Sequence, residues 1–308
     1  SGVANARFNS AGSASLRYNG AEKLATTSTG IDVTGTAVTD GLTVAGNVSV
    51  DGGTIKLDGN YPTGTSNVAL GDSALNGSMT GQSNVAIGAS AGVSVTSGSQ
   101  NTAVGTASLL SATTSNYNTG IGRDALRLNT TASNNTAVGY QSLYANTTAQ
   151  HQTAVGFQAL ANATTGGSNT AVGKEAAEYT TTGSNNVAVG ELALTANTTG
   201  VGNTSLGRAS LYSSTTASYN TAVGYNTLLS NTTGSGLVGI GATALDANST
   251  GSNNTAVGYA ALGANTTAGN NTAMGYAALT ANTTGNNNTA FGYADLQANT
   301  VGDRKVVV

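Results

Sequence analysis

A short pattern of apolar, small and polar positions repeats through most of the chain. In each copy a Val or Thr, a small residue and an apolar residue precede a glycine, as in Thr255-Ala256-Val257-Gly258. This glycine recurs every 17 residues from Gly71 to Gly292, which gives fourteen copies without an insertion or a deletion. Disordered low-complexity sequence does not keep its apolar residues at one fixed spacing over many copies. We therefore expect residues 65–300 to be ordered.

The 17-residue unit predicts one strand and two turns. The alternation of β-branched and small residues before the glycine is typical of a strand, and Asn-Thr-Thr-Gly at 282–285 is a turn signal. The stretch after the glycine, such as 259–264, is compatible with a second strand or with a single helical turn. A strict short period is typical of a solenoid. We therefore expect an all-β fold, a parallel β-solenoid or β-roll of fourteen coils.

Leucine marks one further position of the repeat. The residue four places after the glycine is Leu in twelve of the fourteen copies, and Gly92 and Ala177 are the exceptions. We expect these leucines, among them Leu262 and Leu279, to form an inward-facing column, because a large aliphatic side chain gains most by burial.

A single coil of this sequence would not be stable by itself. It carries about two large apolar residues, each worth about 1.5–3 kcal/mol when fully buried, whereas ordering one repeat costs about 25 kcal/mol. We expect ladders between coils and burial between chains to supply the difference. The small-residue face of the strand suits packing against another backbone, so the sequence predicts a homo-oligomer. Stacked coils would form a rod about 60 Å long.

Residues one repeat apart should lie one above another, and their chemistry is compatible. Val257 and Met274 are expected to be such neighbours. Directly after the glycine, Lys174, Glu191 and Arg208 alternate in charge over three consecutive coils. We interpret both columns as structural ladders.

Two further columns carry side chains that stack well. Tyr259, Tyr276 and Tyr293 follow three successive glycines; the structural interpretation is coil-to-coil stacking, and the alternative is contact with the sugar rings of a glycan. The strand motif begins with Asn in twelve of the fourteen copies, with Gln152 and Leu237 as replacements. Stacked Asn side chains can hydrogen-bond to each other along the axis.

The composition shifts at both ends of the array. Residues 1–60 lack the repeat and predict short strands broken by glycine, for example at Ile31 and Val33, which we expect to intertwine with partner chains. A linker is predicted over 61–66, around the only proline, and the solenoid over 67–308. A fifteenth strand motif begins at Lys305, which is compatible with a fragment of a longer polypeptide or with a capping strand.

The composition excludes several classes of function. The chain has no Cys, one His and only 7% charged residues, with a net charge of −3. A disulfide framework and a thiolate zinc site are therefore excluded, and a basic surface for nucleic acid is absent. The sequence has no apolar run long enough to span a bilayer and no visible signal peptide. We expect no cofactor, no metal and no membrane insertion.

Paired carboxylates are the one enzymatic pattern to test. A glycosidase needs two acids about 5–10 Å apart, one of them with a raised pKa, and Glu175, Glu178 and Glu191 lie on neighbouring coils. Because Lys174 and Arg208 flank Glu191, we interpret these residues as a solvated ladder and expect no enzymatic activity. His151 occupies a slot that holds Asn elsewhere, so we interpret it as a corner residue.

Two other solenoid functions can be weighed from the repeat. A calcium-binding roll needs a recurring Asp, and none recurs here. An ice-binding solenoid needs a flat, regular array of threonines, for which Thr283 and Thr284 have equivalents in most coils. That hypothesis predicts an exposed, planar Thr column and a monomer.

Two segments carry a resemblance to known proteins. The sequences at 18–27 and 29–35 resemble segments of bacteriophage tail fibres, marine and cyanobacterial ones especially, and repeats such as 254–262 resemble those fibres and, more distantly, the head repeats of trimeric autotransporter adhesins. The resemblance implies a homotrimer in the virion tail that positions host-recognition elements for adsorption. The partners it implies are further copies of the chain, other tail or baseplate proteins and host-surface polysaccharide. An adhesin head is the alternative function, followed by the ice-binding solenoid.

Overall fold

The computed structural model describes residues 4–8, 14–18, 21–26, 31–33, 65–76 and 79–308. The chain divides into two compact units, Ser1–Lys56 and Leu57–Val308. The predicted linker over 61–66 falls mostly outside the described residues, as does the part of the predicted 1–60 segment that follows Val33. None of the described residues lies in a helix that could cross a membrane.

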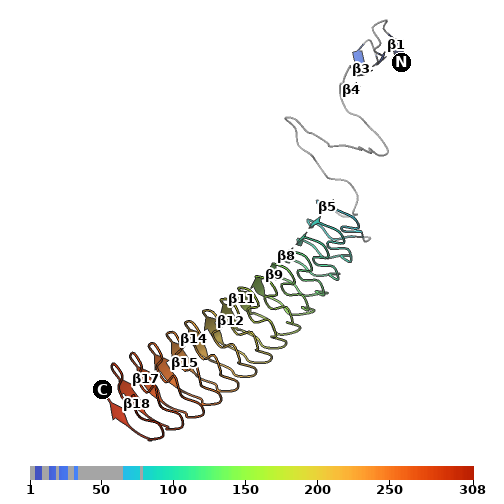
Figure 1. The fold of residues 1–308 in the computed structure, drawn as a ribbon. Coiled ribbons are helices and arrows are strands. Elements are labelled where there is room, and N and C mark those ends of the chain that lie inside the picture. Colours follow the sequence, from blue (N-terminus) through green and yellow to red (C-terminus); the bar gives the residue numbers. More distant parts are fainter. Residues whose placement is uncertain (1–3, 9–13, 19–20, 27–30, 34–64, 77–78) are drawn as a thin grey trace. The chain divides into compact units, whose positions relative to one another are not determined.

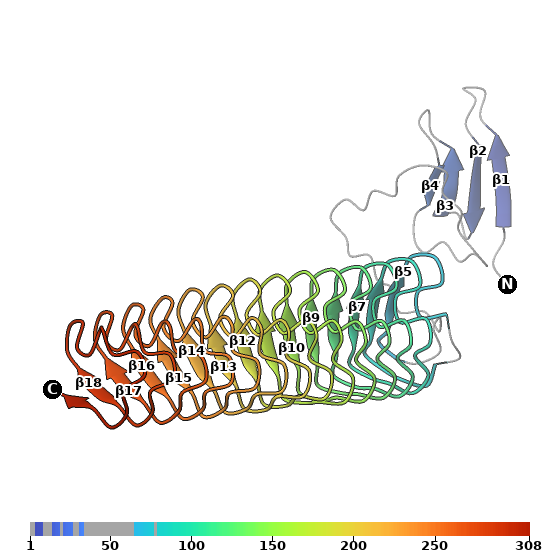
Figure 2. The same cartoon turned by 60° about the horizontal axis from the view of Figure 1, so that its bottom comes forward.

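The second unit is a parallel β-solenoid with 17 residues per coil, as the sequence predicts. Each coil contributes one short strand to a 15-stranded sheet in which sequence neighbours are spatial neighbours. Figures 1 and 2 show the coils stacked in a single row from β5 to β18. The strands are β5 (Val68–Leu70), β6 (Val85–Ile87), β7 (Thr102–Val104), β8 (Thr119–Ile121), β9 (Thr136–Val138), β10 (Thr153–Val155), β11 (Thr170–Val172), β12 (Val187–Val189), β13 (Thr204–Leu206), β14 (Thr221–Val223), β15 (Val238–Ile240), β16 (Thr255–Val257), β17 (Thr272–Met274), β18 (Thr289–Phe291) and β19 (Val306–Val307).

Every described strand of this sheet pairs in register with the equivalent strand of the next coil. Val257 lies opposite Met274, as expected for residues one repeat apart. The fifteenth strand, β19, pairs with β18 through Thr289 and Val306. Backbone hydrogen bonds between coils also occur outside the strands, for example from the Leu262 N–H to the Ala278 carbonyl at 3.0 Å. The coils are therefore joined around much of their circumference.

The stretch after the glycine forms neither of the two structures considered for it. It consists of tight turns with left-handed backbone at alternate positions, such as Ala260 (φ 53°) and Leu262 (φ 52°). The Ala261 N–H donates to the Gly258 carbonyl at 3.4 Å and the Asn265 N–H to the Leu262 carbonyl at 3.1 Å. A left-handed conformation is particularly unfavourable for β-branched residues, which explains why this column holds Leu rather than Val or Ile.

The leucines form the predicted inward column. Leu262 and Leu279 are fully buried together with the equivalent leucines of the earlier coils, Leu296 in the last coil is half-buried, and small residues fill the space around the column. In the coil where Gly92 replaces Leu, Val95 stands at a corner that is polar in many later coils, and a Cβ on Gly92 would lie 3.5 Å from the Val95 side chain. The valine thus restores apolar volume that the glycine removes.

The orientation of the strand differs from the sequence expectation. The small central residue, such as Ala256 or Ala273, is fully buried inside its own coil, whereas the two flanking residues point outward, since side chains alternate along a strand. The small-residue face is therefore covered by the chain itself and is not available to another backbone. The bulky β-branched face is the one directed to solvent.

The asparagines that begin each strand motif form a buried ladder. The backbone N–H of Asn288 donates to Oδ1 of Asn271 at 2.9 Å, and Nδ2 of Asn271 donates to the carbonyl of Gly285 in its own coil at 2.9 Å. Gln152 keeps this pattern, because its Oε1 accepts the N–H of Asn169 at 3.1 Å. Leu237 offers no acceptor and interrupts the ladder for one coil.

A second Asn ladder occupies the corner where the sequence predicts only a turn. Nδ2 of Asn265 donates to Oδ1 of Asn248 at 2.7 Å and to the carbonyl of Ala268 at 3.1 Å. Asn254 of the same coil also donates to the Ala268 carbonyl, at 2.7 Å. One carbonyl therefore ties both ladders together, as buried polar groups require. The corner ladder is interrupted at Ala163 and Ser214, and there Oδ1 of Asn146 and Oδ1 of Asn197 are buried without a partner.

The repeated glycine is required by a close approach between coils. Gly258 has a φ of 137°, and a Cβ built on it would lie 2.6 Å from the carbonyl carbon of Gly275. No other residue fits this space and this conformation.

The first unit is an antiparallel meander, described by itself. It contains β1 (Ala4–Phe8), β2 (Ala14–Tyr18), β3 (Ala21–Thr26) and β4 (Ile31–Val33), in that spatial order. Strand β4 coincides with the strand predicted at Ile31 and Val33. Pairing of β2 with β3 shifts register between Leu16 and Arg17.

Candidate interaction surface

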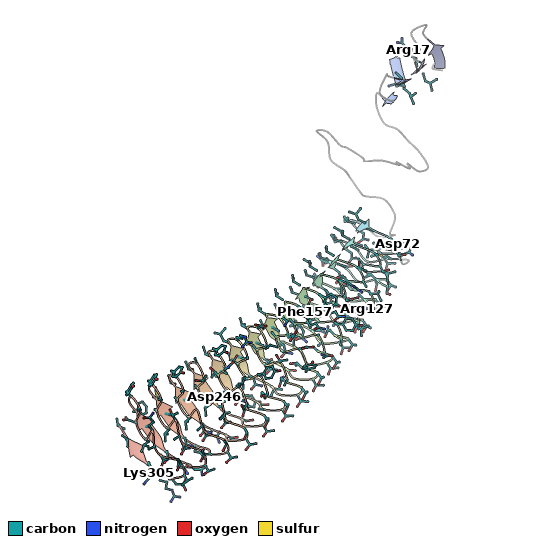
Figure 3. The ribbon with its side chains drawn as sticks, viewed as in Figure 1. Arg17, Asp72, Arg127, Phe157, Asp246 and Lys305 are labelled. Atoms are coloured by element: carbon teal, nitrogen blue, oxygen red, sulfur yellow. The ribbon has the colours of Figure 1, made fainter. Side chains whose placement is uncertain are left out.

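The outer face of the solenoid sheet carries three parallel columns of side chains. The first residue of each strand is Thr or Val and forms the outer Thr column. The last residue of each strand forms the outer apolar column, and the residue after the glycine forms the post-glycine column, to which Phe157 belongs (Figure 3). The outer apolar column consists of Leu70, Ile87, Val104, Ile121, Val138, Val155, Val172, Val189, Leu206, Val223, Ile240, Val257, Met274 and Phe291.

The outer apolar column remains accessible along its length. Leu206 is 45% exposed and Phe291 42% exposed, and the other members are exposed or half-buried. The column contains no polar residue in fourteen coils. Single exposed apolar residues are normal on a protein surface, but a contiguous apolar patch marks an interaction site.

The charged part of the post-glycine column is paired within the chain. Nζ of Lys174 lies 3.9 Å from a carboxylate oxygen of Glu191, and Nε of Arg208 lies 3.4 Å from the other oxygen. Lys174 also contacts Glu175 at 3.3 Å. All four side chains are partly or largely exposed, so these pairs stabilise the coils only slightly.

The aromatic part of the same column is a stack. The ring centroids of Tyr259 and Tyr276 are 5.3 Å apart, those of Tyr276 and Tyr293 are 5.1 Å apart, and the ring planes are within 13° of parallel. Because each ring faces its neighbour, both faces of Tyr276 and one face each of Tyr259 and Tyr293 are covered. Contact of this column with sugar rings stays a prediction. Because the rings stack on each other, a sugar would meet mainly their edges.

Cation–π contacts extend the post-glycine column between its charged and aromatic parts. The guanidinium of Arg208 lies 5.7 Å from the ring centroid of Tyr225, and that of Arg123 lies 6.0 Å from Tyr140. Tyr140 in turn stacks on Phe157 at 5.4 Å. The column is thus a chain of neighbour-to-neighbour contacts with few unsatisfied charges.

The candidate carboxylates lie on the surface of two adjacent coils. Burial raises the pKa of Glu178, and the nearby charge of Glu175 raises it further. Glu175 and Glu191 both contact Lys174, as described above. Within the described ranges, no group of three or more His, Asp or Glu side chains is placed to hold a metal ion. His151 occupies an exposed left-handed corner (φ 59°) that holds Asn in several coils.

The two threonines of the Asn-Thr-Thr corner have different roles. The hydroxyl of the first donates to the backbone of the next coil, as from Thr283 to the Thr300 carbonyl at 3.0 Å. The second, such as Thr284, is exposed, and in the described part of the chain its hydroxyl has no protein partner. Of these two corner threonines, the second is the one whose hydroxyl groups form a free column in the described coils.

Sequence reasoning missed two features of this surface. It did not predict that the outer apolar column points away from the core, although the strictly small residue at the centre of each strand was the available signal. It also treated the corner asparagines as turn residues, since the Asn-Thr-Thr pattern does not distinguish a solvated turn from a buried ladder.

These features define a parallel β-solenoid repeat protein with an apolar outer sheet face. Comparisons of the chain with models of protein families, with curated proteins and with solved structures gave no match.

Proposed function

We propose that this chain is a structural shaft, a rigid homotrimeric segment of a bacteriophage tail fibre that positions host-recognition elements for adsorption. The observation that carries the proposal is the unbroken ladder from β5 to β19, in which all coils are paired in register. With about 4.8 Å between neighbouring strands, the array spans about 65 Å. Bending such a rod requires breaking hydrogen bonds in several columns at once.

The chemistry of the surface supports a mechanical role. Lys174, Glu191 and Arg208 of the post-glycine column pair with each other, and the carboxylate of Glu191 is held between two basic side chains. We therefore propose that the chain is not an enzyme. The resemblance of residues 18–27 and of the repeats to tail fibres supports placement in the virion tail, with tail or baseplate proteins and host polysaccharide as partners.

Solution mass and shape test this function. Light scattering is expected to give three chain masses of 30.0 kDa each, and electron microscopy is expected to show a straight rod of about the predicted length. A single-chain mass would contradict the trimeric shaft. Release of sugar from host polysaccharide, lost in Glu178→Gln, would contradict the absence of enzymatic activity.

Two alternatives remain for the same fold. A trimeric adhesin head would share the architecture and differ in being anchored to a bacterial surface. The ice-binding alternative is favoured by one observation, the exposed column of second threonines such as Thr284. It predicts a monomer with thermal-hysteresis activity, which the same light-scattering measurement and a nanolitre osmometer would detect.

A further inference from the structure

The outer sheet face of the solenoid has no cover within the chain. One face of the sheet packs on the Leu column, while the other exposes the outer apolar column. A contiguous apolar column exposed over fourteen coils exceeds the scattered apolar residues of an ordinary solvated surface and marks an interaction site. We propose that the outer sheet face is the self-association surface of this protein and that its occupant is a second copy of the same chain. This inference rests on the proposed trimeric shaft and names the face through which it assembles.

The size of the face fits a stable protein–protein contact. Alternate residues along a strand are about 6.6 Å apart, so the outer Thr column and the outer apolar column, each about one such spacing wide, together cover a width of about 13 Å. Fourteen coils give a length of about 60 Å at the usual strand spacing. The product, about 800 Å², equals the area that each partner buries in a standard interface.

The distribution of polarity also fits a contact between proteins. The apolar column lies in the middle, with threonines on one side and the post-glycine column on the other. The charges that would lie at the edge, Lys174, Glu191 and Arg208, already pair within the chain. Arg123 pairs with Asp124, so Asp72 in the first coil is the one charged member of the column without an ion pair among the described residues. Association leaves no other unpaired charge of this column buried, which would be costly.

The apolar character of the face is greatest in the last coils. There the outer apolar column contains Met274 and Phe291, which are larger than the valines of most earlier coils, beside the stacked tyrosines. Phe291 is 42% and Tyr293 77% exposed in the single chain. Aromatic residues and Met are enriched at the centres of protein interfaces.

The periodicity of the face selects the occupant. A partner that contacts the whole column must present matching groups at the strand spacing of about 4.8 Å over the entire length. A second copy of the chain has the same spacing, because it is built of the same stacked coils, whereas an ordinary globular partner does not. The Asn-Thr-Thr corner, with its free hydroxyls such as that of Thr131, is polar and exposed and suits the solvent side.

Single thiols provide the first test, since the chain contains no Cys. Ile121→Cys places a thiol in the outer apolar column, and Thr131→Cys places one at the polar corner of the same coil. Ile121 is 39% exposed in the single chain, so a monomer would leave both sites accessible. In the assembled protein we expect a water-soluble maleimide to react at least tenfold more slowly with the first thiol than with the second. Both should react at equal rates after unfolding in urea.

The outcomes separate the two proposals. Equal rates in a preparation with the mass of three chains would overturn the outer sheet face as the interface while leaving the trimeric shaft intact. A single-chain mass for the wild-type protein would overturn both.

A charge variant tests the same face independently. Ile121→Glu with Ile240→Glu introduces carboxylates that point away from the chain's own core, so the circular dichroism spectrum should be retained. We expect this variant to have a single-chain mass, and its control, Thr131→Glu with Thr250→Glu, to remain assembled. Retention of the wild-type mass by the first variant would overturn the inference. So would a monomeric wild type whose ice activity disappears in that variant, because the face would then bind ice.

Discussion

Oδ1 of Asn271 accepts the backbone N–H of Asn288, one coil further along the axis, at 2.9 Å. A side chain thus completes a backbone hydrogen bond between coils at a buried site, where an unsatisfied N–H would be costly. Repetition of this contact along the chain explains how a sequence with few large apolar residues forms a continuous rod.

The two Asn ladders are expected to differ in their contribution to stability. Asn271→Ala removes the acceptor of a buried backbone N–H, so we expect the free energy of unfolding to fall by about 1–3 kcal/mol. The matched change Asn265→Ala leaves every backbone N–H with its acceptor, because Oδ1 of Asn265 accepts only from Asn282. The Ala268 carbonyl that loses a donor keeps Asn254. The column already contains Ala163, so this change should cost less. Chemical denaturation of both variants measures the difference. An equal or larger loss for Asn265→Ala would contradict this assignment.

The glycine after each strand should not tolerate a side chain. Gly258→Ala places a Cβ against the carbonyl of Gly275 in a backbone conformation that suits only glycine. We expect a marked decrease in the melting temperature. Gly263→Ala serves as control, because its φ is not left-handed and the equivalent position of another coil is Ala161. If both variants had the melting temperature of the wild type, the close approach between Gly258 and Gly275 would be contradicted.

The Leu column should be the main apolar contribution of each coil. Leu262 is fully buried, so Leu262→Ala is expected to lower the free energy of unfolding by about 2–5 kcal/mol. Leu262→Asp should disrupt the neighbouring coils and their assembly, because it buries an unpaired charge. Thr267→Ala, at the exposed corner of the same coil, should have little effect. Calorimetry on the three variants provides the measurement.

Asp246 should make stability depend on pH. Partial burial raises the pKa of its carboxyl above the usual value of about 4. The folded chain therefore binds the proton more tightly than the unfolded chain, so Asp246 destabilises the fold at neutral pH. This effect is relieved as the pH falls through the raised pKa. Asp246→Asn should melt at a higher temperature at pH 7 and lose this part of the pH dependence. An unchanged melting profile would show that the burial has no energetic consequence.

Much of the solenoid could be predicted from the repeat alone. The strand at 255–257, its pairing with 272–274 and the buried Leu column follow from strict spacing and from the alternation of β-branched and small residues. The turns with left-handed backbone at Ala260 and Leu262 could not be predicted, because Ala and Leu have no sequence signal for that conformation. The candidate surface was predicted in its parts, the charged and aromatic ladders, but not as a face.

The sequence by itself therefore determined the period, the number of coils and which residues become vertical neighbours, because a repeat without insertions allows only one stacking register. The tertiary structure alone decided which side of each strand faces inward. Leu262 is expected inside from the sequence, but Val257 is equally apolar, and the closure of the coil with its tight turns is what places the valine on the outer sheet face.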